Sequence, residues 1–524
     1  MVPFKSLIQV DKTLSTPVFV QLSNQLGHLI RQGTLAPGQR LPGTRQLAEL
    51  LELNRQTIVS AYEEGLAQGW LESRSGSGTY VADHFPDIKP QGLEVTSAGQ
   101  SAINSLSSGS RPANEQPGYA FESVDFLVRP VLTNQAGLRL DDGFPDIRLA
   151  PMEELSRAYR SYFRWGNPQQ HFGYSDTKGH SLLREQLSTY LNETRGLQTT
   201  PDNVLITRGS IMGLHLASQV LLRPGDVVVV GETTWAGATM NFRKTGATVL
   251  TVPVDQYGLQ VDALEAICQT QRIRMVFVTP HHHYPTTVTL RADRRIKLLQ
   301  LAEQYGFAIL EDDYDYDFHY LSRPILPLAS ADRRGMVVYV GSLTKSVAPA
   351  FRVGYVVAPV ALIDELARHR RIIDRQGDPM LEFAIGQLFK TGDMKRHFRK
   401  TLRAYHARRD HFCDLLASEL PGVIQFNKPD GGLAVWASFD PAIDMELLAQ
   451  RAGHNGLYLS NGLFHNPPGQ RLNSTRLGFA SSSEEELERS VAVLKKVIQQ
   501  AYLVSPPSNA ETTQKPSNKS NERK

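Results

Sequence analysis

The segment around Lys345 places an amine between two groups that bind phosphate. Ser342 precedes this lysine by three residues, and Arg352 follows it by seven. A lysine amine forms a Schiff base with a carbonyl compound, while a hydroxyl and a bidentate guanidinium suit a phosphate group. Pyridoxal phosphate carries both a carbonyl and a phosphate. The spacing therefore predicts a pyridoxal-phosphate site in which Lys345 is the catalytic residue that forms the Schiff base.

Short apolar runs and amphipathic stretches alternate around these residues and must position them. From about Leu138 to Leu503, runs of strand length are separated by helix-like segments. This alternation predicts an α/β domain with a mainly parallel central sheet, whose strands carry ligand groups at their carboxyl ends. The expected strands include Asn203–Thr207, Val227–Val230, Met275–Val278, Ala308–Leu310 and Val337–Val340.

The N-terminal residues have a different pattern, that of three short helices. Apolar residues at helical spacing predict a first helix that Gly33 ends, a second that opens at Thr44, and a third over Arg55–Ala67. The outer face of the third helix is polar near its N-terminal end, as in a recognition helix that meets base edges in the major groove. Its polar residues are Arg55, Gln56, Thr57 and Ser60.

A glycine-rich hairpin is predicted next, over Gly69–Val81, and its tip suits backbone contacts in a minor groove. The runs LPGTRQLAE, NRQTIVSAYE and ESRSGSGTYV resemble the winged helix of the GntR family. The resemblance covers most of residues 10–82 and implies an operator of double-stranded DNA. The alternative is a winged helix that binds proteins while its arginines are solvated. The residues implied in DNA binding are Arg45, Arg55, Gln56, Thr57, Ser60, Gly76 and Gly78.

The motifs of the C-terminal region stand in the order found in a fold-type I pyridoxal-phosphate aminotransferase. One of them, Thr207–Ile211, follows a strand and opens a helix, where backbone amides and the serine hydroxyl can hold a phosphate. Together with the N-terminal module, the chain resembles a MocR-type member of the GntR family. The cofactor-binding residues that this resemblance implies are Tyr174, Gly209, Ser210, Ile211, Trp235, Asp312, Tyr314, Ser342, Lys345 and Arg352.

The resemblance also implies a role for single side chains. Trp235 stacks on the pyridine ring, although it could instead be a core aromatic. Asp312 pairs with the ring nitrogen, and Tyr314 reaches the ring oxygen O3′. Tyr174 matches a tyrosine that touches the phosphate of the other subunit, which implies a homodimer with a shared pocket. Arg476 matches the arginine whose fork holds the carboxylate of an amino-acid effector.

Two positions depart from the family pattern. Tyr284 stands where family enzymes carry an asparagine that bonds O3′, so the tuning of the ring and its competence for turnover stay open. Ala236 and Gly237 follow Trp235, where some relatives have a second arginine for an ω-carboxylate. A GABA-like ligand is therefore disfavoured.

Two apparent metal motifs are rejected. Consecutive residues of a strand point to opposite faces, so at most two of the three histidines at 281–283 converge. Asp313, Asp315 and Asp317 imitate the opening of a calcium loop. The loop glycine is absent, however, and Pro324 stands where the bidentate glutamate belongs. We expect no bound metal.

Length and composition predict a multidomain globular protein. A chain of 524 residues exceeds one ordinary domain, and 41% hydrophobic with 21% charged residues is typical of a soluble protein with a sizeable core. Two cysteines, Cys268 and Cys413, favour a reducing cytoplasm, and no signal peptide or membrane-length apolar run is evident. The predicted parts are a winged helix over 10–83, a flexible linker over 84–134, a pyridoxal-phosphate domain over 135–503 and a disordered tail over 504–524.

A cofactor pocket and a DNA reader in one chain predict a sensor. We expect a cytoplasmic, dimeric transcriptional regulator that binds pyridoxal phosphate and responds to an amino compound or to vitamin B6. One alternative is a working aminotransferase with an accessory DNA-binding module, because most groups for transamination are present. A third possibility is a sensor for which occupancy by the cofactor is itself the signal. The sequence specifies neither the effector nor the operator.

Overall fold

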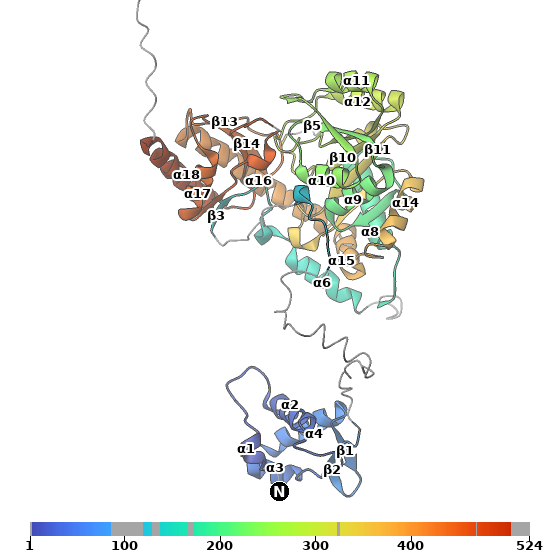
Figure 1. Ribbon diagram of the computed structural model, residues 1–524, viewed down its shortest axis with the longest axis vertical. Coiled ribbons are helices and arrows are strands. Elements are labelled where there is room, and N and C mark those ends of the chain that lie inside the picture. The colour runs from blue at the N-terminus through green and yellow to red at the C-terminus, as the bar shows by residue number, and fades with distance from the viewer. Residues whose placement is uncertain are drawn as a thin grey trace, which may run out of the picture. The chain divides into compact units, whose positions relative to one another are not determined.

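The computed structural model describes residues 3–84, 119–127, 137–164, 172–321, 325–467 and 469–504. They belong to two compact units, Met1–Glu122 and Ser123–Lys524 (Figure 1). The predicted linker lies largely outside the described residues, and so does the predicted tail except for Val504. None of the described helices combines the length and the hydropathy that crossing a membrane requires.

The smaller unit is a group of helices followed by a hairpin, as predicted. Strand β1 pairs antiparallel with β2, with Leu71 opposite Val81, and Tyr80 makes a further bridge to Arg40. The Leu22 and Ile58 side chains are fully buried in the core between the helices. The elements are α1 (Phe4–Leu7), α2 (Val18–Arg31), α3 (Thr44–Leu51), α4 (Arg55–Ala67), β1 (Leu71–Arg74) and β2 (Gly78–Val81).

Local sequence features set the ends of these helices. The Asn54 side chain accepts a hydrogen bond from the backbone N–H of Gln56 at 2.8 Å and so caps the start of α4. Gly33 follows α2 with a φ of +76°, a conformation that glycine adopts without strain. The predicted start of the third helix and end of the first are therefore confirmed.

The larger unit is built on a seven-stranded sheet with the order β4-β12-β11-β10-β9-β5-β6. Within this sheet β12 runs antiparallel to β4 and β11, and the other neighbouring strands pair in parallel. This confirms the mainly parallel sheet and the five predicted strands. The strands are β4 (Val204–Thr207), β5 (Val227–Gly231), β6 (Thr248–Val252), β9 (Ile273–Val278), β10 (Ala308–Asp313), β11 (Val337–Ser342) and β12 (Gly354–Val357).

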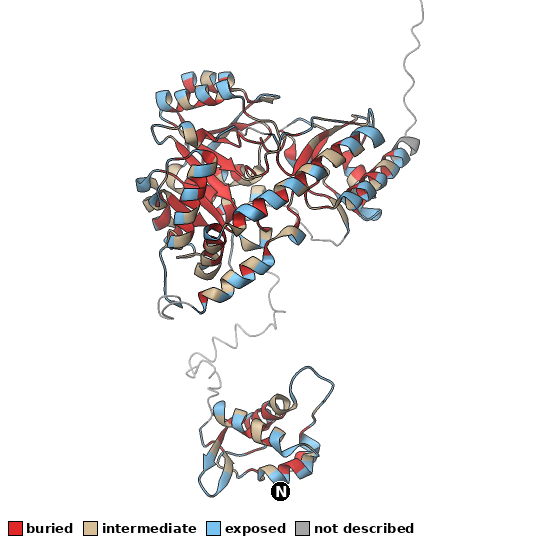
Figure 2. Ribbon diagram, turned by 180° about the vertical axis from the view of Figure 1, so that it is seen from behind, coloured by how far each residue is buried: buried red, intermediate tan, exposed pale blue. Residues whose placement is uncertain are grey.

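Helices cover both faces of this sheet, and its residues are mostly buried (Figure 2). Helices α9 (Gly209–Leu221), α10 (Ala236–Lys244) and α14 (Val360–Arg371) pack on one face. Helices α8 (Ser181–Arg195), α11 (Val261–Thr270), α12 (Ala292–Tyr305) and α15 (Pro379–Lys390) pack on the other. The remaining elements of this part are α6 (Met152–Tyr162), β7 (Val254–Asp255), β8 (Gly258–Leu259) and α13 (Leu328–Ala331).

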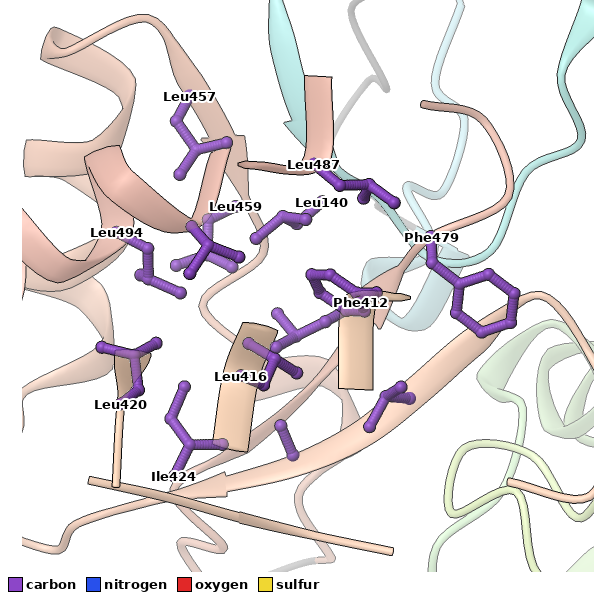
Figure 3. Packing of buried hydrophobic residues seen from close by; sticks show 14 of the residues in the cluster. Leu140, Phe412, Leu416, Leu420, Ile424, Leu457, Leu459, Phe479, Leu487 and Leu494 are labelled. Carbon is purple, nitrogen blue, oxygen red and sulfur yellow. The ribbon is translucent and has the colours of Figure 1, made fainter. Parts of the chain in front are cut away.

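A second core lies at the C-terminal end of the same unit. Buried leucine and phenylalanine side chains such as Leu140, Leu416 and Phe412 gather there (Figure 3). Leu140 precedes the large sheet in the chain, so the segment before that sheet is part of this core. The elements are β3 (Leu138–Leu140), α16 (Asp393–Glu419), β13 (Ile424–Phe426), β14 (Ala434–Phe439), α17 (Met445–His454), β15 (Leu457–Leu459), β16 (Ser474–Gly478) and α18 (Glu484–Val504).

Candidate functional site

The carboxyl edge of the large sheet gathers the predicted cofactor residues. Asp312 is the second-to-last residue of β10 and lies opposite Val340 of the parallel strand β11, which itself ends at Ser342. Strand β12 runs the opposite way, so Arg352, which precedes it, returns to the same edge. Ser342 lies opposite Gly354, and Gly354 lies opposite Thr207 at the end of β4. The start of α9 therefore lies at this edge too.

Arg352 and the start of α9 form an anion-binding corner. Arg352 has a φ of +50°, and its Nη2 donates to the carbonyl oxygen of Arg208 at 3.3 Å. Gly209 has a φ of +73°, and a Cβ there would lie 2.9 Å from the Nη2 of Arg352. Only glycine lets the guanidinium approach this closely. Ser210 and Ile211 complete the first turn of α9, whose free backbone N–H groups favour an anion.

Asp312 is a buried carboxyl, only 5% exposed, whose Oδ1 has no hydrogen-bond partner among the described residues. Burial, with smaller contributions from Asp313 and Asp315, raises its pKa to about 8. The alternation along β10 sends Asp313 to the other face, where its carboxylate accepts from the Tyr339 hydroxyl. Asp312 therefore ends its side chain in a buried oxygen that has no donor in the described part of the chain, and a protonated pyridine nitrogen fits it.

Lys345 follows β11, and its amine points at the segment after β3. Its Nζ donates to the carbonyl oxygen of Gly143 at 2.8 Å and lies 4.1 Å from the ring centroid of Phe144. Burial lowers the pKa of this amine, and the nearby Asp142 carboxylate opposes that change. A lysine with a lowered pKa is more readily available as the neutral nucleophile.

Arg476 is 2% exposed and is paired with a carboxylate of the chain itself. Its Nε lies 2.9 Å from Oδ1 of Asp142, and its Nη1 donates to the carbonyl oxygen of Pro285 at 3.0 Å. The Tyr284 hydroxyl donates to Oδ2 of the same carboxylate at 2.8 Å. Sequence reasoning identified Arg476 and Tyr284 but missed Asp142, because an acidic residue in a loop has no distinctive pattern.

Tyr314 lies beside Tyr284 and Arg476, and Trp235 lies at the start of α10. The Tyr314 hydroxyl donates to the backbone carbonyl of His282 at 3.0 Å, and its ring stands 6.3 Å from that of Tyr284. Trp235 precedes α10, is half-buried and packs against the core on that face of the sheet. A Cβ at Gly237 would lie 2.5 Å from the indole, so this glycine makes room for the ring. The structure gives Trp235 a packing role, and its stacking role stays a prediction.

Tyr174 is the most exposed of the predicted cofactor residues, and Ile211, at 47%, is also exposed. The Tyr174 side chain is 78% exposed, and the guanidinium of Arg375 lies 3.8 Å from its ring centroid. No described contact joins it to Lys345 or Arg352 of its own chain. This position agrees with the predicted role of a tyrosine that serves another subunit.

Two of the predicted DNA-contacting residues, Arg45 and Arg55, lie together on the smaller unit. Arg45 and Arg55 are exposed, line the same hollow and form no ion pair within the described part of the chain. Gln56 is exposed at the start of α4, while Thr57 and Ser60 are half-buried. Two arginines held free at the start of a helix suit contacts to phosphates or base edges.

The hairpin turn also has features that suit close contact. Gly76 is exposed with a φ of +70°, and no atom lies near the position of its missing Cβ. A Cβ at Gly78 would lie 3.4 Å from Nε of Arg40, so this exposed arginine extends over the base of the turn. The sequence analysis did not identify Arg40, because Arg40 lies near the hairpin turn only through its β-bridge to Tyr80.

Comparisons with known proteins agree with both units. The family model "Aminotransferase class I and II" matches residues 146–494, and "Bacterial regulatory proteins, gntR family" matches residues 20–81. The probable rhizopine catabolism regulatory protein MocR of Rhizobium meliloti is 29% identical, over 93% of this chain and 95% of MocR. The HTH-type transcriptional regulator TauR of Rhodobacter capsulatus is 30% identical, over 91% of this chain and 96% of TauR. The chain belongs to the MocR-type regulators of the gntR family.

Solved structures similar to this MocR-type chain are aminotransferases. A kynurenine aminotransferase of Pyrococcus horikoshii has a TM-score of 0.65 at 27% identity, over 70% of this chain and 92% of its own. A multiple substrate aminotransferase from Thermococcus profundus has a TM-score of 0.67 at 26% identity, over 73% of this chain and 98% of its own. The larger unit of this MocR-type regulator therefore has the fold-type I aminotransferase-like fold, and the smaller unit is its gntR-type DNA-binding module.

Proposed function

We propose that this regulator binds pyridoxal phosphate at Lys345, and that an amino compound in the same pocket, or the cofactor itself, changes its affinity for operator DNA. The observation that carries the proposal is the buried Asp312 carboxyl, whose Oδ1 has no partner among the described residues. A protonated pyridine nitrogen is the donor that such a carboxyl lacks. When bound, pyridoxal phosphate supplies a carbonyl carbon that forms a reversible C=N bond with amines.

The chain's own groups can hold the cofactor at three points. Arg352, the Ser342 hydroxyl and the backbone N–H groups at the start of α9 bind the phosphate. The Asp312 carboxylate keeps a proton on the ring nitrogen. The amine of Lys345, whose pKa is lowered by burial, reacts with the carbonyl. Together these residues would hold the cofactor at its phosphate, its ring nitrogen and its carbonyl.

The pairing of Arg476 with Asp142 limits the class of effector. An α-amino acid reaches the arginine only when its carboxylate takes the place of Asp142, because two carboxylates at one guanidinium repel each other. An amine without a carboxylate leaves this ion pair intact. The affinity of an α-amino acid therefore includes the cost of displacing Asp142 from Arg476, whereas the affinity of a simple amine does not.

The segment 142–144 carries two of the contacts that a ligand in the pocket would disturb. Asp142 pairs with Arg476, and the carbonyl of the neighbouring Gly143 accepts a hydrogen bond from Lys345. A ligand that binds both Arg476 and the cofactor breaks both contacts at once. We infer that the loss of these two contacts is the change in the larger unit that alters operator binding.

A homodimer is the form in which this regulator would act. Tyr174 is exposed and lies in the chain beside Phe172, which is 63% exposed; Ile372, near Arg375, is 86% exposed. Exposed apolar side chains of this size favour a subunit interface. Two winged helices related by a two-fold axis would match an operator with two half-sites in the cytoplasm.

The test measures cofactor and operator binding on the same preparation. Borohydride should fix pyridoxal phosphate to the wild-type chain and not to the Lys345→Ala chain, while both chains bind operator DNA. An effective amine should then change operator affinity of the wild type by about 5- to 150-fold. If no amine changes that affinity and amino groups are transferred efficiently, the chain is a working aminotransferase and the regulatory proposal is wrong.

A further inference from the structure

Three histidines meet beside the pocket, on loops that follow two neighbouring strands. His281 and His282 follow β9, and His319 follows β10. Because β9 and β10 pair in parallel, both loops leave the sheet at the same edge. One ring nitrogen from each of the three lies within 4.8 Å of the other two. The third consecutive histidine, His283, faces elsewhere, and its Nε2 lies 2.8 Å from the carbonyl oxygen of Thr233.

The sequence predicted that at most two of the consecutive histidines converge because it assumed a strand, whereas these residues lie in the loop after β9. It could not anticipate His319, which lies far along the chain and joins them only through the fold. The expectation of no metal was therefore based on an incomplete set of side chains. The structure supplies the third imidazole that the sequence pattern lacked.

The ring nitrogens of this cluster are buried without partners. Both nitrogens of His281, both of His319 and the Nε2 of His282 have no hydrogen-bond partner among the described residues. His281 is 3% exposed and His282 is 1% exposed. Buried polar atoms are almost always paired, so several unpaired nitrogens in one place indicate a shared ligand.

The cluster also has the surroundings of a metal-binding imidazole group. Oδ1 of Asp315 lies 2.8 Å from Nδ1 of His282, the carboxylate–histidine contact that orients a metal ligand and leaves its other nitrogen free. The nearby Arg195, which would repel a cation, is paired with Asp317 at 2.8 Å.

A close backbone approach keeps space at the free nitrogen of His282. A Cβ at Gly431 would lie 2.4 Å from this Nε2, so a larger residue there would block it. Gly431 also forms the β-bridge to His319 and so sets the distance between the two rings. Position 431 must be glycine because any Cβ there would overlap the His282 ring.

We propose that His281, His282 and His319 bind one divalent transition-metal ion, of which Zn²⁺ fits best. Three imidazoles with an open fourth position and no thiolate are a ligand set of zinc, and they do not suit Ca²⁺ or Mg²⁺. A Zn–N distance of about 2.0–2.1 Å brings tetrahedral ligand nitrogens to about 3.4 Å from one another.

The ion would act on the pocket through a short connection. His282 accepts the hydrogen bond of Tyr314 at its backbone carbonyl, so a metal that fixes this residue also fixes the position of the pocket tyrosine. The proposal does not depend on the identity of the cofactor or effector. It concerns only the histidines and the chain that carries them.

The experiment titrates the full chain, freed of metal with a chelator, with cobalt(II) chloride and then zinc chloride. Cobalt in a site of this kind has a visible absorption band, and zinc should remove it at one equivalent per chain. His281→Ala and His319→Ala should abolish the band, while His454→Ala, an exposed histidine at the end of α17, should keep it. Asp315→Asn should weaken cobalt binding by about 10- to 100-fold.

Folding is checked in parallel, because His281 and Asp315 are buried. Zinc chloride should raise the thermal unfolding midpoint of wild type and of His454→Ala, and should leave that of His319→Gln unchanged; magnesium chloride should change none of them. Circular dichroism of His319→Gln before heating verifies that this variant is folded. The proposal is wrong if wild type binds no stoichiometric cobalt, or if His319→Gln binds it as tightly as wild type does.

Discussion

Replacing Asp142 with asparagine should reverse the ligand preference of the pocket. The carboxylate lies 2.9 Å from the Nε of Arg476, which is itself almost wholly buried. The asparagine keeps the shape and the ability to accept from Tyr284, but it removes the charge that competes with an incoming carboxylate. Hydrogen bonds to charged groups contribute about 1.5–3 kcal/mol. An α-amino acid should therefore bind about 10- to 150-fold more tightly to Asp142→Asn than to wild type.

The assay compares two ligands that differ only in the carboxylate, for example alanine and ethylamine, by their effect on the absorption of the bound cofactor. Ethylamine is the matched control, because it cannot use Arg476, and its affinity should change little. The variant should also be less stable to urea in the absence of ligand, since removing one partner of a buried ion pair costs about 3–5 kcal/mol. An equal change for both ligands, or none for alanine, would show that Asp142 does not compete at Arg476.

Three further predictions concern the cofactor and DNA. Because the pKa of Asp312 is raised to about 8, the cofactor-free folded chain keeps a proton that the unfolded chain loses near pH 4. The free energy of unfolding should therefore fall as pH rises from about 4 to 8, by at most on the order of 5 kcal/mol. Urea unfolding of Asp312→Asn should show a flatter pH profile. Lys345→Ala should bind operator like wild type in a gel-shift titration but lose the response to amines. Arg55→Ala should lose about 1–3 kcal/mol of operator binding and relax specificity at one base position, whereas an equal loss on all sequences with a smaller salt slope would identify a phosphate contact.

The parts of the fold that the sequence predicted depend on local patterns. The Asn54 side chain caps α4 by accepting a hydrogen bond from Gln56, two residues further along the chain. Gly33 ends the first predicted helix because its backbone has a positive φ. The strands of the large sheet are short runs of β-branched residues, and Asp312 and Ser342 stand at their carboxyl ends. Residues of this kind are predictable because neighbours in the chain decide their conformation.

The parts that escaped prediction depend on partners far along the chain. Asp142 meets Arg476 across 334 positions, and His319 reaches His281 only because two strands pair in parallel. Asp315 and Asp317 resemble one motif in the sequence, yet they serve different partners, His282 and Arg195. Alternation along a strand predicts which face a side chain takes, but not what another segment brings to that face.

The antiparallel strand β12 determines which pocket residues can be substituted without disturbing the sheet. The loop that carries Lys345 and Arg352 leaves the sheet at the end of β11 and returns at the adjacent strand, closed by a hydrogen bond from the N–H of Leu343 to the carbonyl of Val353 at 2.9 Å. Both attachment points are thus fixed by one neighbouring pair of strands. Substitutions within the loop can alter affinity for a ligand without shifting the register of the sheet. A regulator built this way can acquire new effectors while the scaffold beneath them stays the same.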